Sequence, residues 1–139
     1  MDRVLLALGI AVAAGALAMV LRRRRPDAPM QPSGRIPHQL DRADFDQPAT
    51  TWLVAVFTSA TCDACQDVRS KADVLATNEV AVSVAEYPER RDLHERYRID
   101  AVPLVVIADA QGVVQKSFLG PVSATDLWAA VAEARASGA

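Results

Sequence analysis

The two cysteines of the chain, Cys62 and Cys65, are the residues whose type and spacing most directly indicate chemistry. They stand in the run Thr-Cys-Asp-Ala-Cys, after an apolar segment at 52–57 and before a stretch with helical periodicity. A cysteine at a helix N-terminus lies beside unpaired backbone N–H groups, which favour the thiolate that attacks disulfides. The second cysteine follows almost one turn later and faces the same way. The motif therefore predicts a redox-active dithiol.

Two other interpretations of the cysteine pair stay open. One is an inert pair of thiols at the edge of a core, and the other is a structural zinc site, which needs four ligands. His38 and His94 are far from the cysteines in the sequence and are not at ligand spacing, so we expect no metal in a single chain. A four-thiolate site would require a second copy of the chain. His38, in a proline-flanked loop, and His94, in a charged helical run, are both expected at the solvent-exposed surface.

An apolar segment at 4–21 (VLLALGIAVAAGALAMVL) precedes the rest of the chain. Its 18 residues approach the ~20 that a helix needs to cross a bilayer. A cleaved signal peptide is the alternative, but such a peptide carries its positive charge before the apolar stretch. Here Asp2 offsets Arg3, and four arginines follow the segment at 22–25. We therefore predict one transmembrane helix at 4–21.

The four arginines at 22–25 also predict the orientation of this helix. The end of a span that carries more Lys and Arg stays in the cytoplasm. The sequence thus predicts a single-pass protein of the cell membrane with its C-terminal domain in the cytoplasm; an extracytoplasmic domain is the alternative. A cytoplasmic dithiol is kept mostly reduced by the thiol pool.

Charge is distributed unevenly along the chain, which carries 15 basic and 17 acidic residues. Residues 26–139 hold 10 basic and 16 acidic residues, a net charge of −6. A nucleic-acid-binding domain would be basic instead, so no nucleic-acid partner is expected. The basic collar at 22–25 suits anionic lipid headgroups.

Four prolines between positions 26 and 37 predict an extended linker, so that residues 22–36 form the collar and linker and a folded domain occupies 37–139. Apolar runs predict strands at 52–58, 80–84, 104–107 and 113–118, with a turn at 109–112. Helical spacing predicts a helix at 62–77, and a second helix is expected to open at Pro88. A last helix, capped by Ser123 or Thr125, carries the apolar stripe Leu127, Trp128 and Val131. This order predicts an α/β fold, a mixed sheet flanked by helices on both faces.

The order of elements, with the dithiol opening the first long helix, resembles the thioredoxin family over residues 45–137. A second motif supports the resemblance: the segment at 97–103 (YRIDAVP) is similar to the one around that family's cis-proline, and Gly120 stands where the family keeps a glycine. The resemblance implies a thioredoxin-like fold and a cis Val102–Pro103 bond beside the dithiol, where the backbone can pair with an extended substrate.

Three departures from the family pattern affect the expected chemistry. Thr61, Asp63 and Ala64 replace the Trp and the Gly-Pro of ordinary thioredoxins. A carboxylate at Asp63 should raise the pKa of the Cys62 thiol and make the couple more reducing. The family's buried carboxylate aligns with Val56, and its lysine partner aligns with about Val84. Cys65 then lacks the usual general base, so its proton must leave through water or another group.

Together, these features predict a membrane-tethered thiol-disulfide oxidoreductase that needs no cofactor. Cys62 would attack a client disulfide and Cys65 would resolve the mixed disulfide, with Thr61, Asp63, Ala64, Val102 and Pro103 contacting the substrate. The expected partners are protein thiol or disulfide clients and a reducing system, either the thiol pool or a reductase. The alternative function is a non-enzymatic interaction module or redox sensor. An exported version acting in disulfide isomerisation or in cytochrome and metal-site maturation depends on the opposite orientation.

Overall fold

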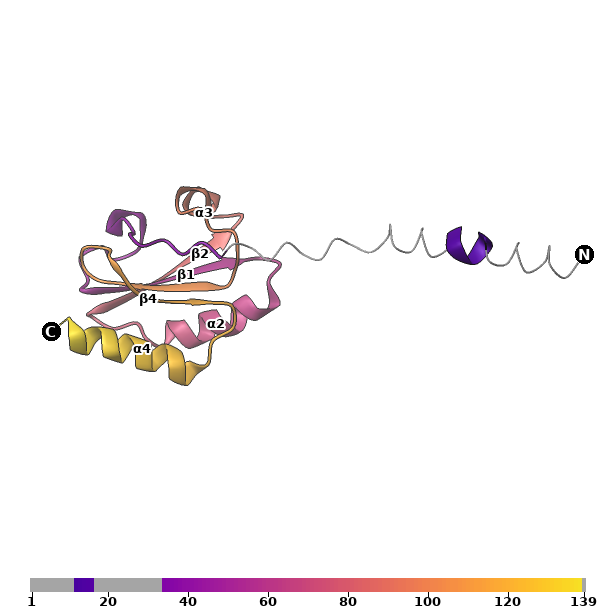
Figure 1. Ribbon diagram of the computed structural model, residues 1–139. Coiled ribbons are helices and arrows are strands. Elements are labelled where there is room, and N and C mark those ends of the chain that lie inside the picture. The colour runs from indigo at the N-terminus through magenta and orange to yellow at the C-terminus, as the bar shows by residue number, and fades with distance from the viewer. Residues whose placement is uncertain (1–11, 17–33, 139) are drawn as a thin grey trace, which may run out of the picture. The chain divides into compact units, whose positions relative to one another are not determined.

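The computed structural model describes residues 12–16 and 34–138 (Figure 1). Residues 12–16 form a short, exposed helical segment. The rest of the predicted membrane span at 4–21, and nearly all of the collar and linker at 22–36, lie outside the described residues. Within the two described ranges, no helix combines the length and the apolar character that crossing a membrane requires.

A four-stranded mixed sheet organises residues 34–138. The strands are β1 (Trp52–Ser59), β2 (Val80–Tyr87), β3 (Leu104–Ala108) and β4 (Val114–Leu119), in the spatial order β2-β1-β3-β4. β1 runs parallel to β2 and antiparallel to β3, and β3 and β4 form an antiparallel hairpin. Because β1 is central and contacted on both faces, its residues from Trp52 to Thr58 are all buried, as the continuous apolar run predicts.

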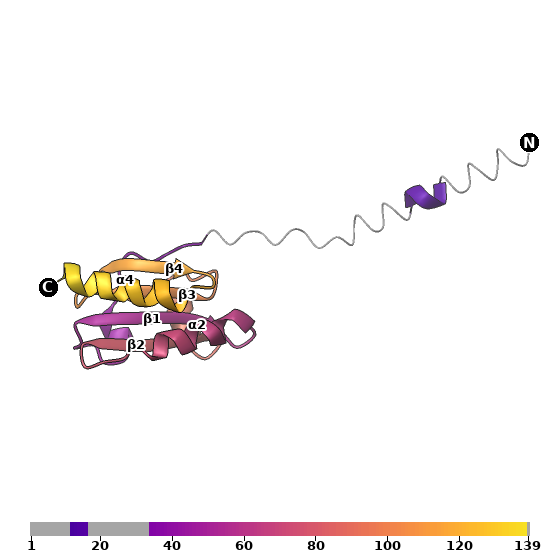
Figure 2. The same ribbon diagram turned by 90° about the horizontal axis from the view of Figure 1, so that it is seen from below.

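Helices cover both faces of this sheet, which confirms the predicted architecture. α2 (Asp63–Asp73) and α4 (Ala124–Ser137) lie on one face, and α3 (Arg91–Arg96) and the 3₁₀ helix η1 (Arg42–Asp44) lie on the other (Figures 1 and 2). The parallel β1–α2–β2 unit is followed by the hairpin and the last helix, in the predicted order.

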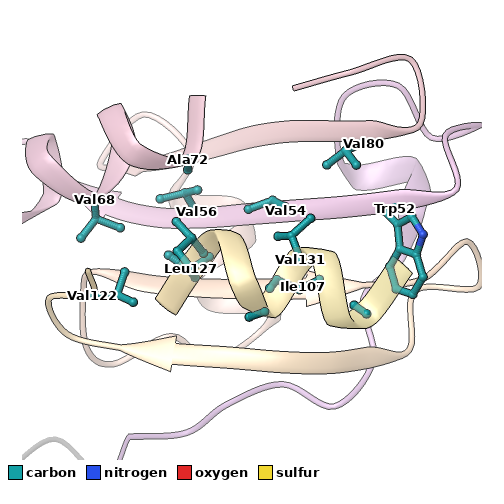
Figure 3. Packing of buried hydrophobic residues seen from close by; sticks show 13 residues of the cluster. Trp52, Val54, Val56, Val68, Ala72, Val80, Ile107, Val122, Leu127 and Val131 are labelled. Atoms are coloured by element: carbon teal, nitrogen blue, oxygen red, sulfur yellow. The ribbon is translucent and has the colours of Figure 1, made fainter. Parts of the chain in front are cut away.

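The alternation of side chains along β1 divides the interior into two cores. Val54 and Val56 point toward α2 and α4, where they pack with Val68, Leu127 and Val131 (Figure 3). Leu53, Ala55 and Phe57, which alternate with them along the strand, point to the other face. There they pack with Leu93 of α3 and with Phe45, the residue after η1. This second core includes Leu40, Phe45, Leu53, Ala55, Phe57, Leu93 and Leu104.

Several predicted boundaries were wrong. α2 ends at Asp73 rather than at Thr77, because the Thr77 hydroxyl accepts hydrogen bonds from the backbone N–H groups of Glu79 and Val80 and turns the chain into β2. β2 continues to Tyr87, three residues beyond the predicted end. The following helix begins at Arg91, because Pro88 lies in a turn after a cis Tyr87–Pro88 bond.

The last helix has the predicted cap but not the full predicted stripe. The Ser123 hydroxyl accepts from the backbone N–H of Asp126 at 3.0 Å, while Leu127 and Val131 are buried. Trp128 is 46% exposed, contrary to the prediction. Its indole N–H donates to the Lys71 carbonyl at 3.0 Å. The side chain thus links α4 to α2 at the edge of the core.

Candidate active site

The dithiol lies at the edge of the sheet where three strand ends meet. β1 and β2 are parallel, so both end at this edge, whereas the antiparallel β3 begins there. The register places Phe57 opposite Leu104. The turn that carries Cys62 therefore leaves the sheet beside the loop that delivers Val102 and Pro103 to β3.

Cys62 and Cys65 form a disulfide, with their Cα atoms 5.4 Å apart. Cys62 is the N-cap of α2 in extended conformation, and its backbone N–H donates to the Ser59 carbonyl at 3.1 Å. Cys65 lies in the first turn, where its N–H donates to the Cys62 carbonyl at 3.3 Å. Cys62 is half-buried and Cys65 is only 3% exposed. Cys62 is therefore the more solvent-accessible of the two cysteines.

The residues around the sulfurs are mostly open to solvent. Thr61 and Asp63 are exposed and Ala64 is half-buried. The Thr61 hydroxyl lies 3.3 Å from that of Ser59, which closes the turn after β1. Asp63 is the acidic residue of the first turn of α2, as the sequence predicts, where a carboxylate suits the helix dipole.

The Val102–Pro103 bond is cis, which confirms the expectation drawn from the resemblance. Pro103 is buried, and its carbonyl accepts a hydrogen bond from the Gly120 N–H at 2.8 Å. Gly120 has φ +89°, a conformation that favours glycine. The glycine after the hairpin thus holds the proline loop in place, and Val102 remains half-buried beside it.

Val56 and Val84, the positions where the resemblance implied a carboxylate and its partner, lie opposite each other in register. Val56 is fully buried against α2 and α4, and Val84 is half-buried on the same face. The core between the sheet and α2 and α4 is therefore apolar at the position of Val56 and Val84.

Thr58 and Glu86 were not predicted as site residues. Both line a cavity of about 300 Å³ with Cys62 and Cys65. The sequence identifies Thr58 only as the end of a predicted strand, and Glu86 falls beyond the predicted end of its strand. Their position two residues after Val56 and Val84 is the signal that would have found them, since alternate strand residues share a face.

His94 was expected at the surface, and this prediction was wrong: the residue is only 7% exposed. An imidazole nitrogen, Nε2, lies 2.8 Å from the Ala85 carbonyl, and the ring meets Phe57 edge-on with centroids 5.5 Å apart. The charged residues around His94 in the sequence concealed that it shares the inner face of a short helix with Leu93. His38 is exposed, as predicted.

A larger cavity lies on the α3 side of the sheet edge, with a volume of about 720 Å³. Ser59 and Val102 line it together with His94 and Tyr87, so it adjoins the loop that the resemblance assigns to the substrate. The cation Arg91 also lines it, with its guanidinium 5.7 Å from the centre of the Tyr87 ring.

Comparison with solved structures identifies this architecture as thioredoxin-like. Yeast (Saccharomyces cerevisiae) mitochondrial thioredoxin 3 in its oxidised form superposes with a TM-score of 0.51 at 20% identity, over 60% of this chain and 79% of that one. Thioredoxin of Fasciola hepatica gives 0.53 at 20% identity, over 62% and 83%. Thioredoxin-2 of a malaria parasite, described as a component of its protein secretion machinery, gives 0.54 at 17% identity, over 60% and 82%.

No protein-family model matches the chain, and no curated protein matches it in sequence. At these identities the structural likeness shows the fold. The fold is a thioredoxin-like mixed sheet with a Cys-x-x-Cys pair at the start of α2, a combination that supports thiol-disulfide oxidoreductase activity.

Proposed function

We propose that this protein is a thiol-disulfide oxidoreductase whose working group is the Cys62–Cys65 dithiol. The observation that carries the proposal is the placement of the pair: an accessible Cys62 caps α2, a buried Cys65 lies one turn behind it, and the cis Val102–Pro103 loop begins the neighbouring strand. This arrangement provides an attacking sulfur, a resolving sulfur and a backbone edge for the client.

The reaction is two successive thiol-disulfide exchanges. The Cys62 thiolate attacks one sulfur of the client disulfide, forming a mixed disulfide and releasing the other client sulfur as a thiolate. Cys65, as a thiolate, then attacks the Cys62 sulfur and expels the second client sulfur. Two electrons pass from the dithiol to the client, and the product is the Cys62–Cys65 disulfide. A reductase or the thiol pool returns it to the dithiol, and no cofactor takes part.

Client binding in this proposal uses backbone more than side chains. The Val102 peptide groups at the start of β3 would pair with an extended client segment, as an added strand does. Thr61, Asp63 and Ala64 would border the client on the α2 side. Such a site selects an extended, accessible disulfide and places few demands on the client sequence.

A membrane tether is part of the proposal and depends on the sequence of the N-terminal region. The 18-residue apolar segment at 4–21 supports a single span, and the arginines at 22–25 support a cytoplasmic C-terminal domain. A tether raises the effective concentration of membrane-proximal clients without altering the exchange chemistry. Reporter fusions at the C-terminus of the full chain test the orientation: a reporter active only in the cytoplasm supports it, and one active only outside contradicts it.

The Cys65→Ser variant of the full chain tests the exchange chemistry, since it cannot resolve a mixed disulfide. Incubated with a peptide containing a disulfide, it should accumulate a covalent adduct on Cys62 that dithiothreitol removes. The Cys62→Ser variant should form far less, because the remaining sulfur is buried. Absence of any adduct would contradict the proposal.

A non-enzymatic interaction module is the second candidate, and the apolar pair Val56 and Val84 favours it because valine stands at the position of the family's buried carboxylate. The oxidoreductase requires Cys62 and Cys65, whereas a binding module does not. Partner capture that persists in a Cys62→Ser, Cys65→Ser double variant, without disulfide reduction by the wild type, would support the module.

A further inference from the structure

The cavity beneath the dithiol is polar where the adjacent core is apolar. It measures about 300 Å³, enough for several water molecules at about 30 Å³ each. Its lining includes both cysteines and six residues with polar side chains. These are Thr58 and Ser59 of β1, Asp63, Gln66 and Arg69 of α2, and Glu86 of β2.

The Thr58 hydroxyl indicates that this cavity holds water. The residue is only 2% exposed, and its Oγ1 has no hydrogen-bond partner among the described residues. Buried hydroxyl groups in native proteins are nearly always hydrogen-bonded, to protein or to ordered water. A hydroxyl at the wall of a cavity large enough for several water molecules is suited to hold one of them there.

Glu86 lies directly opposite Thr58 in the parallel register of β1 and β2. The pair follows Val56 and Val84 by two residues on each strand, so it shares their face of the sheet and lies one step nearer to the dithiol. Glu86 is half-buried and forms no ion pair with any described residue. The chain therefore carries a carboxylate close to the buried sulfur, displaced along the strand from the position that the resemblance implied.

The charged groups near Glu86 come from two elements. Arg69 of α2, with Glu89 and Arg90 from the segment before α3, lines a neighbouring hollow that also includes Glu86. Arg90 is engaged with Asp92 at 3.2 Å, and Arg69 lies 3.9 Å from Asp73. From the sulfur side, Asp63 is the other carboxylate in the cavity lining. Arg69 is thus the cation that lines both the cysteine cavity and the neighbouring hollow beside Glu86.

We propose that Glu86 accepts the proton of the Cys65 thiol during the resolving step, through water held in the cavity by the Thr58 hydroxyl. The proposal rests on the dithiol exchange proposed above. The Cys65 S–H bond breaks and its proton passes by way of water to the Glu86 carboxylate. The sulfur electron pair then forms the bond to Cys62 as the Cys62–client bond breaks, and the leaving client thiolate takes a proton from solvent. Thr58 is a positioning residue in this scheme.

A single-turnover experiment on the full-length reduced protein measures this step directly. Glutathione disulfide serves as the oxidant, and acid quenching followed by alkylation separates the glutathione adduct from the final Cys62–Cys65 disulfide. In Glu86→Gln we expect the conversion of adduct to disulfide to slow at least about tenfold at pH 7. The rate should approach that of the wild type at alkaline pH, where the Cys65 thiol ionises without help.

Further variants separate proton transfer from a structural effect. Thr58→Val removes the hydroxyl but keeps the shape, so it should slow the same step and preserve the thermal unfolding midpoint. Glu86→Asp should retain the pH profile of the wild type. Glu89→Gln is the matched control, because Glu89 borders the neighbouring hollow and not the cysteine cavity, and its rates should equal those of the wild type.

The outcomes also distinguish this inference from the proposed function. A wild-type resolving rate and pH profile in Glu86→Gln would overturn the role of Glu86 while leaving the exchange intact. Formation of the adduct is measured independently in the Cys65→Ser background, where adding Glu86→Gln should change nothing. If that background forms no glutathione adduct at all, the proposed exchange itself fails.

Discussion

Val56 of β1 lies directly opposite Val84 of β2, and both side chains face the core that α2 and α4 cover. This apolar pair stands where the thioredoxin resemblance implied a carboxylate and its partner. The position of Val56 and Val84 therefore belongs to the hydrophobic core. Polar side chains, those of Thr58 and Glu86, stand two residues further along the same strands, beside the cysteines.

Introducing the thioredoxin family's carboxylate at Val56 should destabilise the fold. Val56→Asp places a charge in a fully buried site without a partner, so we expect the free energy of unfolding to fall by about 3 kcal/mol or more at pH 7. Val84→Asp is the matched control, since this half-buried position lets a carboxylate reach water and should cost less. Urea unfolding measures both; equal losses would contradict the assigned burial.

Removing the carboxylate of Asp63 should make the dithiol a weaker reductant. The charge beside Cys62 opposes the thiolate, so Asp63→Asn should stabilise the reduced form and raise the reduction potential by roughly 10–20 mV, because an exposed charge acts weakly. Titration against glutathione buffers measures the change. Glu133→Gln is the control, because this exposed carboxylate on α4 pairs with Lys116 and does not line the cysteine cavity; it should leave the potential unaltered. A lower potential in Asp63→Asn would contradict the argument.

Stability at high pH should depend on Tyr97. Burial, and then the hydrogen bond that its hydroxyl donates to Asp44, raise the pKa of Tyr97 from 10.0 to about 12. The folded state favours the neutral phenol, so this contribution is complete below pH 10 and is lost as pH rises from about 10 through about 12. Tyr97→Phe should be about 1 kcal/mol less stable at pH 7. The difference between the two proteins should shrink over that pH range; a constant difference in urea unfolding would refute the prediction.

Two glycines with positive φ should respond differently to alanine. At Gly112 an added Cβ would lie 1.9 Å from the Leu40 carbonyl oxygen. This distance is far too short for a non-bonded contact, so the backbone at Leu40 would have to move. At Gly120 an added Cβ would meet nothing within 4 Å, so only the backbone conformation is penalised. We expect Gly120→Ala to cost about 1–2 kcal/mol and Gly112→Ala clearly more. Thermal unfolding of both variants gives the comparison, and equal shifts would count against the close contact.

The sequence predicted those parts of the fold that simple patterns specify. Strong apolar runs located all four strands, and the dithiol and its proline located the two motifs of the site. The patterns failed where tertiary contacts decide the outcome. His94 looked like a surface residue because its neighbours are charged, yet Phe57 and the Ala85 carbonyl hold it inside.

Two further features could not be read from local patterns. η1 follows from contacts across the chain: the Leu40 N–H donates to the Gly112 carbonyl, and the Asp41 N–H donates to the Tyr97 hydroxyl. Thr58 and Glu86 lie opposite each other because of the register of β1 and β2, two strands that α2 separates in the sequence. The alternation along each strand places the two side chains on the face of Val56 and Val84, but only the register brings them together at the cavity of the cysteines.

The reduction potential of the Cys62–Cys65 pair decides whether this dithiol acts as a reductant. Full-length protein, equilibrated with glutathione buffers and followed by thiol alkylation, should show a reversible two-electron couple near or below the value of thioredoxin, about −270 mV. Such a value would support a reductant and the effect ascribed to Asp63. A strongly oxidising value would contradict both the reductant role and the cytoplasmic orientation, and the absence of any reversible disulfide would contradict the proposed enzyme.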